Sequence, residues 1–411
     1  MIDEIQLAAL IIFLGTYALI SVGRAGRSRL QMPSTALAGG VIMILSGVES
    51  PSFALASINW NTVLLLLGMM LVVSGLEASG FFAWISRMLV ARARTPFAFL
   101  ILSSCMTALL SALILNDAVV LMFTPVIIHA TRKMGISPVA PLVMEAISAN
   151  IGSAATEVGN PQNAYIASVS GISFHTFSLY IIPPAVFSLL ISLLIAYFFV
   201  SREKVRQNTE ESDFRPGPAL YFMLGLIVAV FAGFYTASLT HIPIAFIALG
   251  AGAASFFAVP FLTETTQQEL IARVDWGIII FFLGLFILIG GLQSSGLLTH
   301  IIDVLTLGNK GSIATSGGLT VVTAVLSNLV SNVPAVLLLS PFVKLQAART
   351  LWLTLAASST FAGNATIIGA AANVIVARSA AKDGVDIRLS QFMKIGMPVT
   401  IVSLLLTVLL I

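Results

Sequence analysis

Long apolar blocks alternate with short polar breaks along the whole chain. A hydrocarbon core near 30 Å needs about 20 apolar residues of α-helix, so blocks of this length are typical of membrane spans. The pattern predicts an all-α polytopic membrane protein. The blocks cover residues 5–23, 33–49, 61–79, 97–131, 138–170, 174–200, 218–238, 242–259, 277–297, 313–348, 351–378 and 392–411.

Four of these blocks are too long for one straight crossing. As a single helix, residues 97–131 would be about 52 Å long. Lysine and arginine collect in cytoplasmic loops, and a fold-back at 97–131 places the following basic residues, Arg132 and Lys133, inside. We therefore expect ten crossings and two re-entrant hairpins, with both termini outside. The basic residues that this topology leaves outside are Lys310, Lys344 and Arg349.

The two halves of the chain resemble each other. A shift of 216 residues pairs Trp60 with Trp276, and it pairs the stretch from Ser111 to Pro125 with Ser327 to Pro341. The shift then falls to 210, pairing Ala155, Thr156, Gly159, Asn163 and Ala167 with Ala365, Thr366, Gly369, Asn373 and Ala377. Five crossings in each half would invert the second half relative to the first, and inverted repeats with interrupted helices are typical of secondary transporters.

The repeat predicts the domain organisation. Residues 1–200 form the first inverted repeat, with scaffold helices, the hairpin 97–131 and the broken helix 138–170. Residues 201–217 form a cytoplasmic linker. Residues 218–411 form the second repeat, with scaffold helices, the hairpin 313–348 and the broken helix 351–378.

The composition agrees with a membrane protein and excludes several other classes. Of the 411 residues, 58% are apolar and 9% are charged, whereas a soluble domain carries about a quarter charged residues. The single cysteine, Cys105, excludes a disulfide framework, and the four histidines show no metal-ligand spacing. The basic residues form no nucleic-acid patch. No ATP-binding motif is present, so we expect no cofactor, no enzyme activity and a proton or sodium gradient as the driving force.

Polar residues at membrane depth are costly and usually functional. They concentrate at the two expected hairpin tips, around Asn116 and Asn332, and in two stretches that interrupt the long blocks at 148–163 and 363–373. Gly, Asn and Pro unwind these helices and leave free N–H and C=O groups. The sequence predicts that they form one polar chamber. Amide and hydroxyl groups in such a chamber can replace water around a small solute.

Two acids are candidates for proton coupling. A carboxyl group at membrane depth holds its proton more tightly, which suits a carrier. We assign this role to Asp117 and Glu157, with Glu145 as a further titratable group. Asp117 also fits a structural role as a helix N-cap, and the two roles are compatible.

These motifs resemble the ion transporter superfamily over nearly the whole chain. The resembling stretches are NDAVVLMFTP (116–125), ANIGSAATEVGNPQN (149–163), SNVPAVLLLSP (331–341) and GNATIIGAAAN (363–373). The chain is most similar to the branch of arsenite/antimonite permeases, which is related to pink-eyed-dilution-type proteins and to dicarboxylate/sodium symporters. The resemblance implies an elevator-type fold, a homodimer, and an ATPase subunit as a further partner. It also implies substrate contacts from Asn116, Asp117, Asn150, Thr156, Asn332, Asn364 and Thr366, and Asn163 and Asn373 of the same polar stretches complete the expected substrate-binding set. In one departure, Asn160 stands where many members have aspartate, which weakens a sodium-antiporter interpretation.

The leading hypothesis is proton-coupled efflux of arsenite or antimonite across a bacterial or archaeal inner membrane. A chamber of Asn, Ser and Thr with one carboxyl, and with no arginine expected inside it, suits an uncharged hydroxylated solute. The alternatives are a sodium- or proton-coupled transporter of a dicarboxylate or inorganic oxyanion, and a sodium/proton antiporter. A receptor or scaffold role would leave the duplicated polar breaks unexplained.

Overall fold

The computed structural model describes residues 3–24, 31–93, 95–199, 216–305 and 314–411, and these contain helices and no strand. The predicted all-α fold is confirmed. The longer helices are α1 (Glu4–Arg24), α2 (Met32–Leu45), α4 (Trp60–Ala78), α5 (Phe81–Arg92), α6 (Pro96–Leu113), α7 (Asn116–Met134), α8 (Val139–Ala154), α9 (Pro161–Ser170), α10 (Phe174–Tyr197), α11 (Pro218–Thr240), α12 (Ile244–Leu262), α14 (Trp276–Ser294), α17 (Ser316–Val330), α18 (Asn332–Gln346), α19 (Arg349–Ala362), α20 (Ala371–Lys382) and α21 (Leu389–Leu410). The shorter ones are α3 (Pro51–Ser57), α13 (Gln267–Ala272), α15 (Leu297–Leu305), η1 (Gly363–Ala365) and η2 (Ile367–Gly369).

Eight of the described helices are long and apolar enough to cross a membrane: α1, α4, α6, α10, α11, α12, α14 and α21. Three shorter apolar helices, α2, α8 and α17, accompany them. Because α6 meets the same length criterion as the others, length alone does not separate a hairpin arm from a crossing. The count of ten crossings and the sidedness therefore stay predictions. Most of the predicted linker (201–215) lies outside the described residues, as does Lys310.

The helix bounds recur with the spacing of the sequence repeat. Helices α4 and α14 have equal length and begin 216 residues apart, and so do the starts of α3 and α13 and of α7 and α18. Helices α9 and α20 begin 210 residues apart. The caps repeat as well, because Asn59 caps α4 by accepting from Thr62 N, and Asp275 caps α14 by accepting from Ile278 N.

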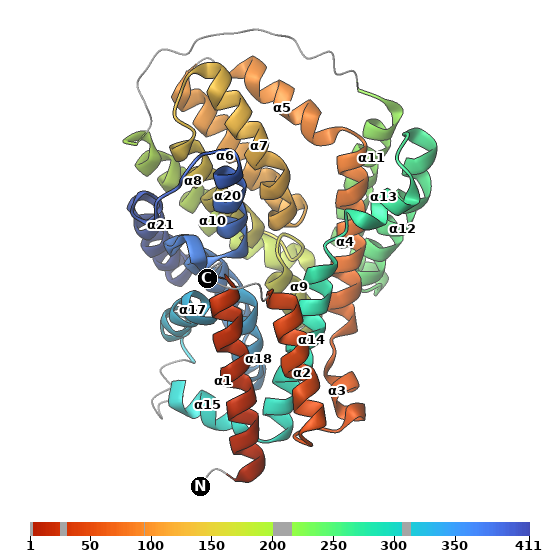
Figure 1. The fold of residues 1–411 in the computed structure, drawn as a ribbon, viewed down its shortest axis with the longest axis vertical. Helices are drawn as coiled ribbons and strands as arrows, with labels where there is room; N and C mark the ends of the chain where they lie inside the picture. The colour runs from red at the N-terminus through yellow and green to blue at the C-terminus, as the bar shows by residue number, and fades with distance from the viewer. Residues whose placement is uncertain (1–2, 25–30, 94, 200–215, 306–313) are drawn as a thin grey trace.

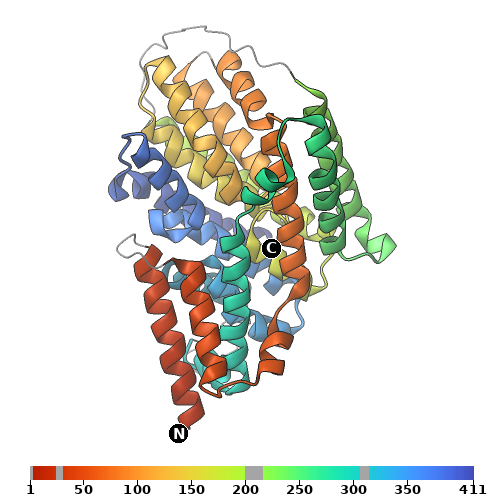
Figure 2. The ribbon, with the colours of Figure 1, turned by 45° about the vertical axis from the view of Figure 1, so that its right-hand side comes forward.

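Helices of the first half pack against helices of the second half. Helix α4 packs on α12 of the other half, and α14 packs on α2. Glycine permits both contacts: a Cβ on Gly68 would lie 2.3 Å from the carbonyl carbon of Ala248, and one on Gly284 would lie 2.4 Å from that of Ala36. Figures 1 and 2 show the two groups of helices that these contacts form. One contains α1, α2 and α14 and lies near the N-terminus, and the other contains α4, α11 and α12.

The remaining long helices form a third bundle in which the predicted interruptions occur. Helices α6 and α7 pack on each other and on α8, and α17 and α18 pack on each other and on α19. The block 97–131 breaks at Ile114 and Leu115, and the block 313–348 breaks at Ser331. The blocks 138–170 and 351–378 break between α8 and α9 and at η1 and η2. These positions bring all four interruptions into the interior of the bundle.

Candidate functional site

A cavity of about 630 Å³ lies where the interruptions meet. Its wall contains the first residues of four helices: Asn116 and Asp117 of α7, Pro161 and Gln162 of α9, Asn332 of α18, and Ala371 of α20. The starts of α14 and α2, with Gln31 just before α2, also line the wall. The first half and the second half of the chain thus both contribute a hairpin tip and a broken helix to one cavity.

Helix N-termini add partial positive charge to the wall of this cavity. The first N–H groups of an α-helix lack partners in the helix, and the helix dipole adds partial positive charge there. No side chain caps α7, α18 or α20, whereas Asn160 caps α9 by accepting from Asn163 N. Such ends bind anions or the oxygens of polar solutes.

The charged side chains on the wall have both signs. Asp117 and Asp275 are acidic, and Arg378 is basic. The sequence-based expectation of a cavity without arginine is therefore wrong. Arg378 enters because Ala371, Val374, Ile375 and Arg378 lie three and four positions apart on α20 and share one helix face. This helical spacing is the signal in the sequence that would have placed Arg378 in the wall.

The tip of the second hairpin has a strained backbone. Ser331 has φ 89° and ψ 159°, a region that residues other than glycine rarely adopt, and this residue lines the cavity. Such a conformation costs about 1–3 kcal/mol and persists only where the surrounding packing imposes it. Its position at the cavity wall associates the strain with the candidate site.

Behind the wall, asparagine side chains join the two halves. The Asn150 amide nitrogen donates to Asn364 Oδ1 and to Asn373 Oδ1, both at 2.9 Å, and Asn150 Oδ1 accepts from Asn116 Nδ2 at 3.5 Å. All four residues are buried. Because Asn116 also lines the cavity, the network connects the wall to both broken helices.

Asn163 and Asn373 act on the broken helix ends. Asn163 Nδ2 donates to Thr156 O at 2.9 Å, and Asn373 Nδ2 donates to Thr366 O at 2.9 Å and to Gly363 O at 2.7 Å. These carbonyls lose their helical partners at the break, and the amides supply replacements. The structure therefore gives both residues a role in holding the interrupted backbone.

The remaining predicted substrate-binding residues differ in their surroundings. Thr156 donates to Ala112 O at 2.7 Å, whereas the Thr366 hydroxyl is buried without a partner. In the amide orientation that satisfies its neighbours, Asn332 donates to Gly369 O at 3.2 Å and to Ser359 O at 3.1 Å. Of the predicted set, Asn116, Asp117 and Asn332 line the cavity, and the others lie behind or beside it.

The other two acids lie away from this cavity. Glu145 is buried, and both of its carboxyl oxygens lie 3.1 Å from the Thr124 hydroxyl, so the pair connects α8 to α7. Glu157 is 1% exposed and lines a different cavity. The structure thus separates the two predicted proton-coupling residues, Asp117 and Glu157.

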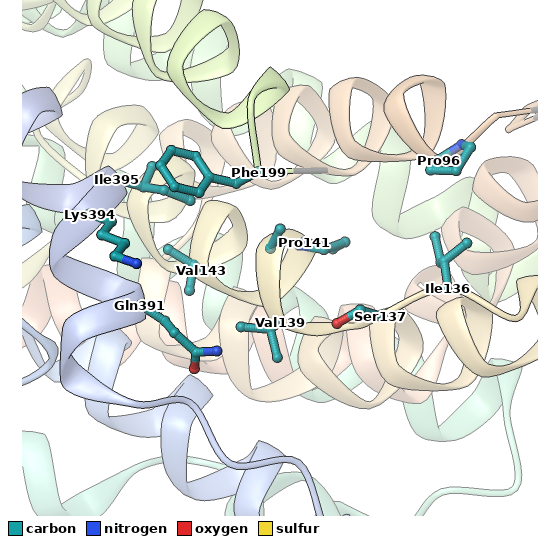
Figure 3. A pocket seen from close by; sticks show the side chains of 11 residues that line it. Pro96, Ile136, Ser137, Val139, Pro141, Val143, Phe199, Gln391, Lys394 and Ile395 are labelled. Carbon is teal, nitrogen blue, oxygen red and sulfur yellow. The ribbon is translucent and has the colours of Figure 1, made fainter. Parts of the chain in front are cut away.

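A further cavity of about 280 Å³ lies between the N-terminal parts of α6, α8 and α21 (Figure 3). Its walls are mainly apolar, with Lys394, Gln391 and Ser137 as the polar side chains. None of the predicted site residues lines it. The polar interruptions therefore converge elsewhere, at the larger cavity.

The comparisons with known proteins agree with this architecture. Residues 17–356 match the model of the citrate transporter family, CitMHS. The chain is 32% identical to an uncharacterized transporter of Mycobacterium tuberculosis, over 98% of this chain and 97% of the relative. It is 28% identical to the silicon efflux transporter LSI3 of Oryza sativa subsp. japonica, over 89% of each protein.

A solved structure shows the same fold. The crystal structure of the Alcanivorax borkumensis YdaH transporter matches with a TM-score of 0.61 and 14% identity, covering 99% of this chain and 98% of that one. The apolar helices and the transporter relatives show a multi-pass membrane transporter. The match over most of its length places the chain in the citrate transporter family.

Proposed function

We propose that the protein is a secondary active transporter that exports arsenite, antimonite or a similar small oxyacid in exchange for protons. The substrate occupies the cavity at the two hairpin tips. The observation that carries the proposal is the composition of this wall, in which amides, helix N-termini and charges of both signs face one volume.

This wall suits an uncharged hydroxylated solute. Arsenous acid is mostly neutral at neutral pH, and its hydroxyl groups both donate and accept hydrogen bonds. Asn116 and Gln162 offer both kinds of partner, Asp117 accepts, and Arg378 donates. A multiply charged anion would meet two carboxylates, Asp117 and Asp275, in the same wall. One relative is named for silicon efflux. Dissolved silicon in neutral water is also an uncharged oxyacid that carries hydroxyl groups.

Coupling to protons requires a carboxyl group that can exchange its proton during transport. Asp117 stands at the first hairpin tip and lines the cavity beside Asn116. Protonation there changes the local charge and so changes the affinity of the wall for the substrate. We assign Asp117 the proton exchange that competes with substrate, in the manner of an antiporter.

A second candidate substrate is a small carboxylate or inorganic oxyanion. Arg378 in the wall and the four helix N-termini favour a negative charge. The description of the family as citrate transporters points the same way.

Transport by the purified protein in proteoliposomes separates these candidates. We expect a proton gradient to drive arsenite accumulation, with no requirement for sodium and little competition from citrate or sulfate. Strong inhibition by citrate or sulfate, without arsenite accumulation, would favour the anion. Proton movement that follows sodium alone would identify a sodium/proton antiporter and contradict both.

A further inference from the structure

A second polar cavity, of about 400 Å³, lies between α4, α9 and the turn from α11 to α12. Asn61 of α4 and Ser168 of α9 give it polar walls, and the exposed His241 comes from the turn. It shares no lining residue with the cavity at the hairpin tips. Helix α9 contributes to both, since Pro161 and Gln162 line the first cavity while Ala164 and Ala167 line the second.

The buried acid of this second cavity is Glu157. It is 1% exposed, and its Oε1 atom is buried without a hydrogen-bond partner. Among the described lining residues, Glu157 and His241 are the ionisable side chains, and none is a lysine or arginine. A charged carboxylate in such a place is costly because it has neither a counter-charge nor a full set of donors.

Glu157 also lies in the break between α8 and α9. It follows Thr156, which donates to Ala112 O on α6, and precedes the cap residue Asn160 of α9. A change in its charge acts directly on the break between α8 and α9. Gln162, the second residue of α9 after this break, lines the substrate cavity.

We propose that the second cavity carries protons to Glu157, apart from the substrate cavity, and that proton-driven transport needs this carboxyl group as well as Asp117. This inference rests on the proposed function and adds a separate proton route to it. The proton binds a Glu157 carboxylate oxygen from water in the cavity and leaves by the same oxygen. Water alongside Ser168 and Asn61 supplies the hydrogen-bonded path.

The first test blocks the cavity in transport assays. Cys105 is the single cysteine of the chain, so a Cys105→Ala background accepts one new cysteine. In it, Ala167→Cys carrying a bulky thiol reagent should lose at least about tenfold of its proton-driven arsenite accumulation. Arsenite–arsenite exchange, which needs no net proton movement, should change less than about threefold. Ala371→Cys, on the substrate cavity, is the comparison variant in which the label should block both processes.

Loss of both processes in labelled Ala167→Cys, or of neither, would overturn the separate route. An unlabelled protein that exchanges arsenite but does not accumulate it under a proton gradient would instead refute the proton coupling of the proposed function, and the proton route with it. A protein that accumulates and exchanges arsenite only with sodium would reassign the cavity to that cation and overturn the inference.

A second test does not depend on transport. Infrared spectra of the purified protein should contain a protonated carboxyl band that is absent from Glu157→Gln. In D₂O this band should shift rapidly in unlabelled protein, and at least about tenfold more slowly when Ala167→Cys carries the bulky label. Equal rates with and without the label would show that protons reach Glu157 by another path and would overturn the inference.

Discussion

The Asn150 amide nitrogen lies 2.9 Å from the side-chain oxygen of Asn373 and donates a hydrogen bond to it. Asn150 belongs to α8 of the first half and Asn373 to α20 of the second. Both side chains are buried away from water, so this bond satisfies polar groups that water cannot reach. It ties the broken helix of one half to that of the other, directly behind the cavity wall.

Asn150→Ala should weaken both folding and transport. The change leaves the oxygens of Asn364 and Asn373 without their Asn150 donor, at a cost of about 1–3 kcal/mol. We expect a lower Tm in detergent and at least about tenfold slower arsenite transport per folded molecule. Gln268→Ala, which removes an exposed amide on α13, is the control. An Asn150→Ala protein with unchanged transport would show that the network only stabilises the fold.

Asp117→Asn should abolish proton-driven transport while leaving the protein folded. The amide has almost the same shape as the carboxyl group but cannot exchange a proton. We expect at least about a tenfold loss of pH-driven arsenite accumulation in proteoliposomes, with arsenite exchange retained. Asp386→Asn, at an exposed position, should behave as the unmodified protein. Retained pH-driven flux in Asp117→Asn would exclude this carboxyl group as a proton carrier.

Arg378→Gln distinguishes a neutral substrate from an anion. A hydrogen bond to a charged group contributes about 1.5–3 kcal/mol, so loss of the guanidinium should weaken anion binding by roughly 10- to 100-fold. For arsenous acid we expect less than about a threefold change in KM. Lys382→Gln removes a positive charge from the same helix without touching the cavity and serves as the control. If the KM rises strongly in Arg378→Gln but not in Lys382→Gln, the oxyanion candidate is favoured over the neutral acid.

Gly68→Ala should destabilise the protein through the contact of α4 with α12. Its new Cβ would lie 2.3 Å from the Ala248 backbone, which has no flexible end to move aside. Overpacking of this kind costs about 1–3 kcal/mol or more. Gly225→Ala on α11 meets open space and should instead stabilise by about 0.5–1 kcal/mol. Thermal unfolding in detergent measures both, and equal Tm values would contradict the close packing.

The stability of the protein should also depend on pH, through Glu49 in the connection between α2 and α3. Glu49 is 3% exposed, its oxygens have no partners, and it packs against Gly290. Burial raises the pKa of Glu49 from 4.5 to about 7. The folded protein therefore binds a proton at Glu49 more tightly than the unfolded chain does. The resulting contribution to folding stability is complete below pH 4.5 and is lost as the pH rises through about 7.

We thus expect the Tm to fall as the pH rises from 4.5 to about 8, and Glu49→Gln to reduce that fall. At pH 8 the variant should have the higher Tm, because an uncharged amide avoids the buried charge. Glu264→Gln, at an exposed position, provides the comparison. A Glu49→Gln protein with the same pH profile as the unmodified chain would assign the pH dependence to other groups.

The sequence predicted the positions of the helix interruptions well. Asn116 begins α7 and Asn332 begins α18, where the polar tips interrupt the apolar blocks. Asn160 and Pro161 open α9 as cap and first residue. These features depend on local chemistry, since proline lacks an N–H donor and asparagine caps helix ends. The short helices α3, α5, α13 and α15 were not predicted, because each lies in or between stretches interpreted as spans or loops.

The roles of individual site residues were harder to predict. Asn163 and Asn116 are both polar residues at an interruption, yet Asn163 holds the broken backbone while Asn116 faces the cavity. Glu157 follows the substrate residues in sequence but lines a separate cavity. The direction in which each side chain points depends on the unwound backbone and on the helices packed around it.

The sequence by itself determined that the chain is helical, crosses membranes and interrupts four of its apolar blocks with polar residues. It could do so because chain length per turn and the cost of burying polar groups act locally. Only the tertiary structure decided that α4 packs on α12, that Arg378 joins the cavity wall, and that Glu157 lies apart from Asp117. These outcomes depend on contacts between segments distant in sequence, whose geometry no local pattern encodes.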